Sequence, residues 1–153
     1  MIKQMKRGLY FDDFEIGDEF ITPSRTITST DIVNFCCLSG DFNEVHANYE
    51  YCKTTPFGEP VAHGPMVYAI AAGLQYASGV NEGSLLALLQ IDAWKLLAPV
   101  KHGDTIRMKS TVLSKKESSK KDRGVVEFKR EILNQNNIVV QEMLATFLYK
   151  RRV

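Results

Sequence analysis

Two side chains that could move a proton together lie in the segment Ser39-Gly-Asp-Phe-Asn-Glu-Val-His46, where Asp41 precedes His46 by five positions. In an irregular segment, this spacing can bring a carboxylate and an imidazole to the same point. Histidine exchanges a proton near neutral pH and aspartate accepts one, so the pair suits acid–base catalysis on water. Asn43, between them, could orient either side chain or cap the turn.

Each of these residues also has an ordinary structural explanation. Asp41 and Asn43 are typical turn residues, and His46 alone would as readily be a hydrogen-bonded core histidine. The chemical interpretation therefore depends on what else lies nearby in the sequence.

A second cluster, Pro60-Val-Ala-His-Gly-Pro65, comes directly before an apolar segment that predicts a helix. The N–H groups at a helix N-terminus point outward and carry partial positive charge. Gly64 has no side chain, so a carbonyl group could approach its N–H closely, as an oxyanion hole requires. We expect His63 to hold this loop in place rather than to act as a catalyst.

The segment 65–78 is nearly free of charge, and Pro65 is tolerated in the first turn of a helix. A helix that is apolar on almost all sides must be buried on most of them. In a domain of this size, we expect a sheet that curls around it.

The preceding part of the chain predicts one strand and one capped helix. A first strand covers 20–27, with Pro23 marking an irregularity. Thr28 and Asp31 form a capping box for a helix that ends at Gly40, and a short helical turn follows at 48–53.

The C-terminal half alternates apolar and polar residues, which is typical of half-buried strands. After an apolar strand at 84–98, turns at 102–104 and 134–137 separate strands that include 106–112, 126–132 and 138–149. These form an antiparallel meander. The fold class is therefore α+β: a single domain, 1–153, with an antiparallel sheet wrapped around a central apolar helix. One open sheet edge and one open face favour a homodimer or a higher homo-oligomer.

Composition narrows the class of partner. The 153 residues carry a net charge of +1, which gives no electrostatic case for nucleic acid or a membrane surface, so a small-molecule substrate is expected. Three cysteines without paired spacing indicate a reducing compartment. With no apolar stretch typical of a secretory signal or a membrane span, the expected location is cytoplasmic.

Several segments together resemble the MaoC-like dehydratases, a family that includes the R-specific enoyl-CoA hydratases. They are Tyr10–Phe20, the Gly-Asp-x-Asn-x-x-His pattern ending at His46, Ala62-His-Gly64, and 92–104. The resemblance extends over nearly the whole chain, and the Gly-Asp-x-Asn-x-x-His portion is its specific part.

This resemblance implies a hot-dog fold, a dimer as the basic unit, and no metal or organic cofactor, coenzyme A being part of the acyl-CoA substrate. It implies a hydro-lyase that adds or removes water across the 2,3 double bond of the acyl group. Asp41 and His46 become the catalytic pair, and the Gly64 N–H becomes the oxyanion donor. Asn43, His63 and Tyr68 are candidates for substrate binding, and Tyr68 with Gln75 could line an acyl tunnel.

The chain departs from the family pattern at three positions. Glu44 stands where proline is usual, Pro65 where methionine commonly follows His-Gly, and Ala72 where some hydratases carry a supporting serine. Two other functions stay open: a hot-dog thioesterase, and a non-catalytic acyl-CoA-binding subunit. Acyl chain length, branching and carboxylation also stay open.

Overall fold

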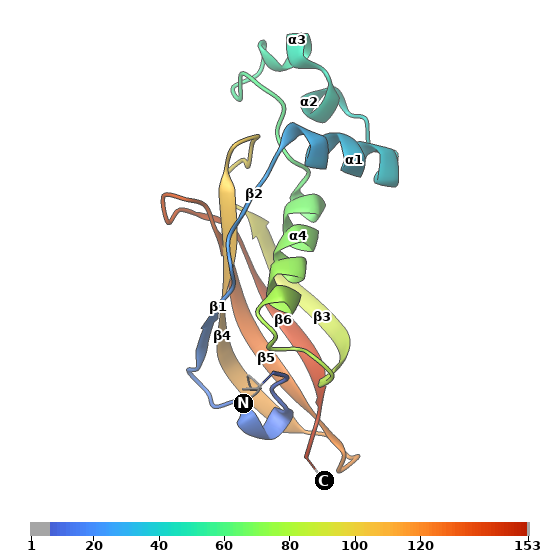
Figure 1. Cartoon of the computed structure of the whole chain (residues 1–153), viewed down its shortest axis with the longest axis vertical. Helices are drawn as coiled ribbons and strands as arrows, with labels where there is room; N and C mark the ends of the chain where they lie inside the picture. Colours follow the sequence, from blue (N-terminus) through green and yellow to red (C-terminus); the bar gives the residue numbers. More distant parts are fainter. Residues whose placement is uncertain (1–6, 153) are drawn as a thin grey trace, which may run out of the picture.

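A computed structural model describes residues 7–152, so the ends of the predicted domain, 1–6 and 153, lie outside the described residues. One long helix lies along one face of a curved sheet, and three short helices gather beyond one end of it (Figure 1). The helical elements are η1 (Phe11–Asp13), α1 (Ser29–Ser39), α2 (Glu44–Ala47), α3 (Tyr49–Cys52) and α4 (Gly64–Ala77). The strands are β1 (Glu19–Ile21), β2 (Arg25–Thr26), β3 (Leu85–Leu96), β4 (Thr105–Glu117), β5 (Arg123–Leu133) and β6 (Val139–Lys150).

The sheet has the strand order β1-β4-β5-β6-β3, and β2 pairs separately with β4. Every pairing is antiparallel. Strands β4, β5 and β6 follow one another as neighbours, which confirms the predicted meander, and α4 lies along the sheet as expected (Figure 1). The α+β class with one central helix is therefore confirmed.

The core lies between α4 and the sheet. Strand β5 alternates strictly between buried and half-buried residues, so one of its faces meets the helix. Buried side chains from α4 and the strands form one cluster: Met66, Val67, Ala71, Leu74, Ile106, Met108, Ile132 and Met143. A second, aromatic cluster covers the other end of the sheet around Phe14, Phe128 and Tyr149. The long helix is thus held along its length, and its first residue has a fixed place.

The ends of α1 follow the predicted local signals. The Thr28 hydroxyl accepts a hydrogen bond from the Asp31 N–H at 3.3 Å, and the Asp31 carboxylate accepts one from the Thr28 N–H at 2.8 Å. At the other end, Gly40 has φ 77° and donates its N–H to the carbonyl of Cys36. This left-handed residue turns the chain toward Asp41.

The prediction of one strand over 20–27 was wrong, because the segment forms the separate strands β1 and β2. Pro23 lies between them and has no N–H to donate to a neighbouring strand. Just before it, Thr22 donates its N–H to the carbonyl of Met108 at 3.0 Å, and its hydroxyl accepts from the Met108 N–H at 2.9 Å. A side chain thus takes over part of the ladder where the strand breaks.

The other predicted elements exist with shifted ends. The apolar helix begins at Gly64 and ends at Ala77, and the turn expected at 48–53 is α3. Helix α2, a single helical turn, was not predicted from the sequence. Among the described residues, no helix has both the length and the apolar character needed to span a membrane.

Candidate active site

Asp41 lies in the turn between α1 and α2, held by short-range hydrogen bonds. Its N–H donates to the Ser39 hydroxyl at 3.1 Å. Its carboxylate oxygen Oδ1 accepts from the Asn43 side-chain amide at 2.6 Å and from the Asn43 N–H at 3.2 Å. Asn43 is therefore a partner of the carboxylate, one of the two roles that the sequence suggested.

His46 belongs to α2 and is anchored to the segment that leads into α4. Its Nδ1 lies 2.6 Å from the carbonyl oxygen of Val61, and the Val61 N–H donates back to the carbonyl of Val45 at 3.0 Å. A carbonyl oxygen can only accept, so Nδ1 carries the hydrogen. In the neutral ring, Nε2 then holds the lone pair and is free to receive a proton.

His63, the last residue before α4, is almost completely buried and connects both members of the pair. Its ring stacks on that of His46 with centroids 3.6 Å apart and planes 25° apart. Its Nε2 lies 3.0 Å from the backbone oxygen of Asp41 and 4.0 Å from the carboxylate oxygen Oδ2. These contacts match the expectation that His63 holds the loop. A direct contact with substrate stays a prediction.

The Asp41 carboxylate is surrounded by groups that favour its ionised form. Its pKa is lowered, chiefly by the hydrogen bond from the backbone N–H of Asn43. The Asn43 side-chain amide and the charges that His46 and His63 carry when protonated act in the same direction, against a partial loss of hydration. Asp41 is therefore a carboxylate at neutral pH and can accept a proton.

Gly64 is the first residue of α4, where an N–H has no acceptor within the helix. Gly64 and His46 line the same cavity of about 460 Å³, with mostly apolar neighbours such as Phe57, Val67 and Leu97. A Cβ added at position 64 would overlap the Leu96 side chain. Glycine thus lets the exposed Leu96 side chain of β3 lie against the helix start, in addition to allowing the close approach of a carbonyl that was expected from the sequence.

Gln141 contacts this helix start and is itself held by Trp94, and neither role was predicted from the sequence. Gln141 on β6 donates its amide to the carbonyl of Gly64 at 2.8 Å, and its own oxygen accepts from the indole N–H of Trp94 at 3.0 Å. Gln141 is buried. The sequence feature that could have indicated this role is a glutamine at an inward-facing position of an otherwise apolar strand.

Tyr68, a predicted site residue, makes none of the contacts described above for Asp41, His46 and His63. It lies one turn into α4, half-buried, with its ring 5.6 Å from that of Trp94. It is not among the residues that line the cavity shared by His46 and Gly64. Asp41 does not line that cavity either, although it lies beside His46.

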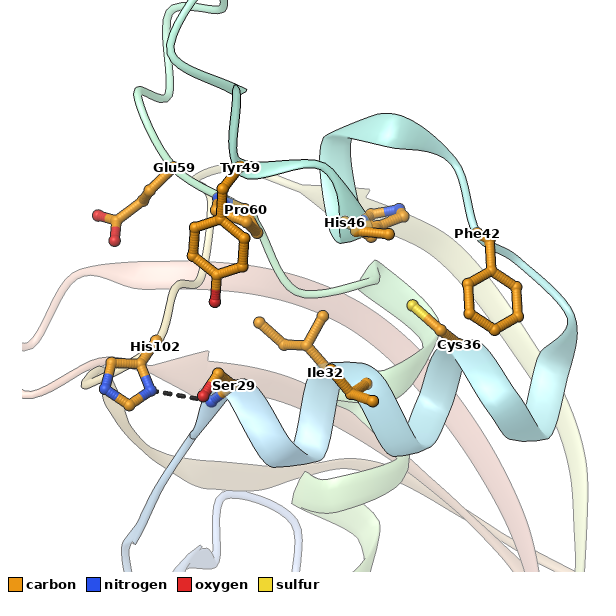
Figure 2. Close-up of a pocket in the computed structure, with 11 residues that line it drawn as sticks. Ser29, Ile32, Cys36, Phe42, His46, Tyr49, Glu59, Pro60 and His102 are labelled. Atoms are coloured by element: carbon orange, nitrogen blue, oxygen red, sulfur yellow. Dashed lines mark hydrogen bonds between the residues drawn. The ribbon is translucent and has the colours of Figure 1, made fainter. Parts of the chain in front are cut away.

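A second cavity, of about 390 Å³, is also lined by His46 and lies between α1 and the segments that carry Tyr49 and Pro60. Figure 2 shows Ile32 and Cys36 on α1 facing His46, Tyr49 and Pro60 across this space. His46 thus lines both this apolar space against α1 and the cavity at Gly64.

Two of the departures from the family pattern fit the local structure. Glu44 is the first residue of α2, a position that suits proline and equally favours an acidic side chain beside the positive end of the helix dipole. Pro65 lies in the first turn of α4, where a missing N–H leaves no helical hydrogen bond unmade. Ala72 lies half-buried on α4 and offers no polar atom.

The three side chains of the site could also approach a metal ion. One ligand atom from each of Asp41, His46 and His63 lies within 4.8 Å of the others. The ring nitrogens that bond to the carbonyls of Val61 and Asp41 carry hydrogen, so a metal ion would have to use the other nitrogen of each ring, Nε2 of His46 and Nδ1 of His63.

Comparison with known proteins identifies the class. Residues 13–134 match the family model described as MaoC like domain, and the chain belongs to this family. It is 40% identical over 102 residues to Protein MaoC of Klebsiella aerogenes, and 34% identical over 104 residues to an (R)-specific enoyl-CoA hydratase of Rhodospirillum rubrum. These matches cover 67% of this chain in each case, but 30% of the first relative's length and 69% of the second's.

Solved structures show the same architecture. A monoamine oxidase regulatory protein from Archaeoglobus fulgius superposes with a TM-score of 0.88 at 34% identity, covering 98% of this chain and all of its own (100%). A conserved hypothetical protein from Mycobacterium tuberculosis, described as having a double hotdogfold, superposes with a TM-score of 0.83 at 19% identity, covering 95% of this chain and 45% of its own. The fold is therefore the hot-dog fold, as the resemblance implied.

Replacing Asn43 tests the electrostatics of Asp41. In Asn43→Ala, the carboxylate loses a side-chain donor, so the pKa of Asp41 rises toward its ordinary value. Titration of the Asp41 carboxyl carbon by NMR in the wild-type protein and the variant measures this shift. The control is Asn48→Ala, because Asn48 caps α3 through Tyr51 and makes no contact with Asp41. An unchanged or lower pKa in Asn43→Ala would contradict the assignment.

Proposed function

We propose that this chain is a hydratase/dehydratase of the R-specific enoyl-CoA hydratase type, which adds or removes water across the 2,3 double bond of an acyl-CoA thioester. One observation carries the proposal: the Asp41 carboxylate and a His46 imidazole with Nε2 free lie together, and His46 shares a cavity with the helix start at Gly64. Membership of the MaoC-like family and the names of its hydratase relatives support the reaction class.

In the hydration direction, Asp41 and His46 hold one water molecule against C3 of the enoyl group. As the water oxygen bonds to C3, one of its protons passes to the pair, and the electron pair of the double bond moves toward the thioester carbonyl. C2 then receives a proton from the pair, so one water has been added and the enzyme is unchanged.

Gly64 would act on the other end of the reacting system. Negative charge develops on the thioester oxygen as C3 is attacked, and an N–H fixed at a helix N-terminus stabilises it. Gln141 holds the carbonyl of Gly64, and Trp94 holds Gln141. The peptide unit that carries the Gly64 N–H is fixed by the bond from the Val67 N–H to the His63 carbonyl at 3.1 Å, so the direction of the N–H is set before substrate arrives. Such preorganised donors are effective because they need no rearrangement during the reaction.

Substitution of the pair tests the reaction. Asp41→Asn and His46→Gln should each lower kcat/KM for crotonyl-CoA hydration by about 100-fold or more, since each removes a group that accepts or returns the proton. Loss of the enone absorbance measures the rate. The matched control is Asp122→Asn in the β4–β5 loop, which should keep wild-type activity. Wild-type-like rates in both site variants would refute the assignment.

Two further measurements on acyl-CoA substrates separate the other two candidate functions. Release of free thiol from an acyl-CoA without hydration would identify a thioesterase. Binding of acyl-CoA without turnover, together with a requirement for a second chain, would identify a non-catalytic subunit. Because the Asp41–His46 pair is intact, we favour the hydratase.

We further propose that the reaction requires no metal or organic cofactor, since a water held by an acid–base pair supplies both hydroxyl and proton. Dialysis against EDTA should leave kcat for crotonyl-CoA within about 2-fold of its initial value, a negligible change on the scale of acid–base catalysis. Metal analysis of the dialysed protein is the control. Loss of activity that added Zn²⁺ or Mg²⁺ restores would contradict this proposal.

We propose that this chain forms a homodimer, the basic unit that the resemblance to the family implies. Strand β3 ends the sheet, and its outer edge has no partner strand among residues 7–152. Several large apolar side chains on it are exposed, including Leu86, Leu88 and Leu89. A long apolar strand edge of this kind promotes pairing with another chain. The cytoplasmic location stays a prediction.

Charging this edge should weaken the assembly. Leu89→Glu places a carboxylate on β3, and analytical ultracentrifugation should show a shift from dimer toward monomer. Ile138→Glu is the control, because Ile138 is equally exposed, at 52%, in the turn before β6. A wild-type protein that sediments as a monomer, or a Leu89→Glu variant that stays fully dimeric, would argue against the β3 edge as the interface.

A further inference from the structure

Arg130 on β5 is a charged side chain inside the core. It is 1% exposed and faces α4, where its guanidinium donates to the side-chain oxygen of Gln75. The guanidinium also lies over the ring of Phe147, 4.2 Å from its centroid, and 5.9 Å from that of Phe128. Its surroundings are these aromatic rings, the Gln75 amide, and the phenols of Tyr68 and Tyr149.

This cation has no anion beside it in the described part of the chain. Its Nε is buried without a hydrogen-bond partner, and no carboxylate is among the groups that act on its charge. Desolvation lowers the pKa of Arg130, while the phenols of Tyr68 and Tyr149 act in the opposite direction. Arginine stays protonated in proteins, so a positive charge is enclosed here without a counter-charge. Burying a charge is unfavourable in free energy unless a partner group offsets the lost hydration.

The position of Arg130 relative to Gly64 places this charge where it could contact the far end of a bound acyl chain. Gln75 and Tyr68 follow Gly64 on α4 by eleven and four residues, positions that share one stripe of the helix with its first residue. At 1.5 Å per residue, the guanidinium therefore lies between roughly 6 and 16 Å along the helix from Gly64. An acyl chain that starts at Gly64 and follows this stripe would end near Arg130.

We propose that Arg130 binds the terminal carboxylate of a dicarboxylic acyl group whose thioester end lies at Gly64. This inference rests on the proposed function and narrows it to a substrate class: 2-enoyl-CoA thioesters that carry a second carboxylate at the far end of the acyl chain. A carboxylate would supply both the missing counter-charge and an acceptor for Nε, in the two-pronged geometry that guanidinium favours.

The length of the stripe sets the length of the chain. With bonds of about 1.5 Å and a hydrogen-bond contact of about 2.9 Å at each end, an acyl group of about five or six carbons spans the middle of this interval. The Gly64 cavity is lined by neither Tyr68 nor Arg130, so binding along this stripe would require side chains between α4 and the sheet, Tyr68 among them, to move aside. Substrate binding would take place with this movement.

Equilibrium binding tests the proposal without depending on catalysis. Glutaryl-CoA and pentanoyl-CoA have five-carbon acyl chains that differ in the terminal carboxylate, and isothermal titration calorimetry measures the affinity of the wild-type protein for each. We expect glutaryl-CoA to bind at least about 10-fold more tightly, since the ion pair forms in a desolvated place. In Arg130→Met this preference should disappear or reverse, while pentanoyl-CoA binds as in the wild type.

Lys129→Met is the matched control, because Lys129 is the neighbouring residue on β5 and faces away from α4, with its side chain 42% exposed. It should keep the preference for glutaryl-CoA. Arg130→Lys retains the charge but loses the fork of donors, so it should keep part of the preference, and it serves if Arg130→Met fails to fold. Circular dichroism on each variant verifies the fold.

The outcomes separate this inference from the proposed function. If the wild-type protein binds both thioesters equally, or Arg130→Met keeps the preference, Arg130 is only a structural cation packed on aromatic rings and the inference fails. Hydration of crotonyl-CoA in those same preparations would leave the hydratase proposal standing. If glutaryl-CoA is preferred through Arg130 but no enoyl-CoA is hydrated, the binding inference stands and the catalytic proposal fails.

Discussion

The site depends on the way two imidazoles bind backbone carbonyl oxygens. His46 gives its Nδ1 hydrogen to Val61, and His63 gives its Nε2 hydrogen to Asp41, while the two rings stack 3.6 Å apart. Because a carbonyl accepts only, each bond fixes a tautomer as well as a ring orientation. The lone pair of the His46 ring is thereby left on Nε2. Without these two bonds, the loop between α1 and α4 could place a carboxylate and an imidazole near each other but not set which nitrogen takes the proton.

The buried helix α4 fixes the position of the two stacked imidazoles relative to Gly64. Helix α4 is held along its length by the sheet, and its first turn is tied to β6 and β3 through Gln141 and Trp94. His63 and Gly64 are consecutive residues at this point. The residue that stacks on His46 and the residue that offers the oxyanion N–H are therefore positioned by the same junction, so a shift of one would move the other.

The polar groups that contact α4 lie at different distances along the helix. The helix start carries the proposed thioester site, and its middle faces Arg130, a buried cation whose bond to Gln75 crosses from helix to sheet. A core built only for stability would not need a charge there, since burying an arginine without a counter-ion is unfavourable. A ligand that supplies the counter-ion would offset this free-energy cost, so it would bind more tightly than a ligand without an anionic group.

The sequence by itself determined the features set by local interactions. Thr28, Asp31 and Gly40 fixed the ends of α1 through contacts between near neighbours, and alternation or uniform apolarity identified the main strands and α4. It also brought Asp41 and His46 together, because they are close in the chain. Only the tertiary structure decided which groups His63 contacts, the anchoring of Gly64 by Gln141, and the isolation of Arg130 from any carboxylate. These depend on contacts between residues far apart in the sequence, whose register is set by packing of the sheet around the helix rather than by any local pattern.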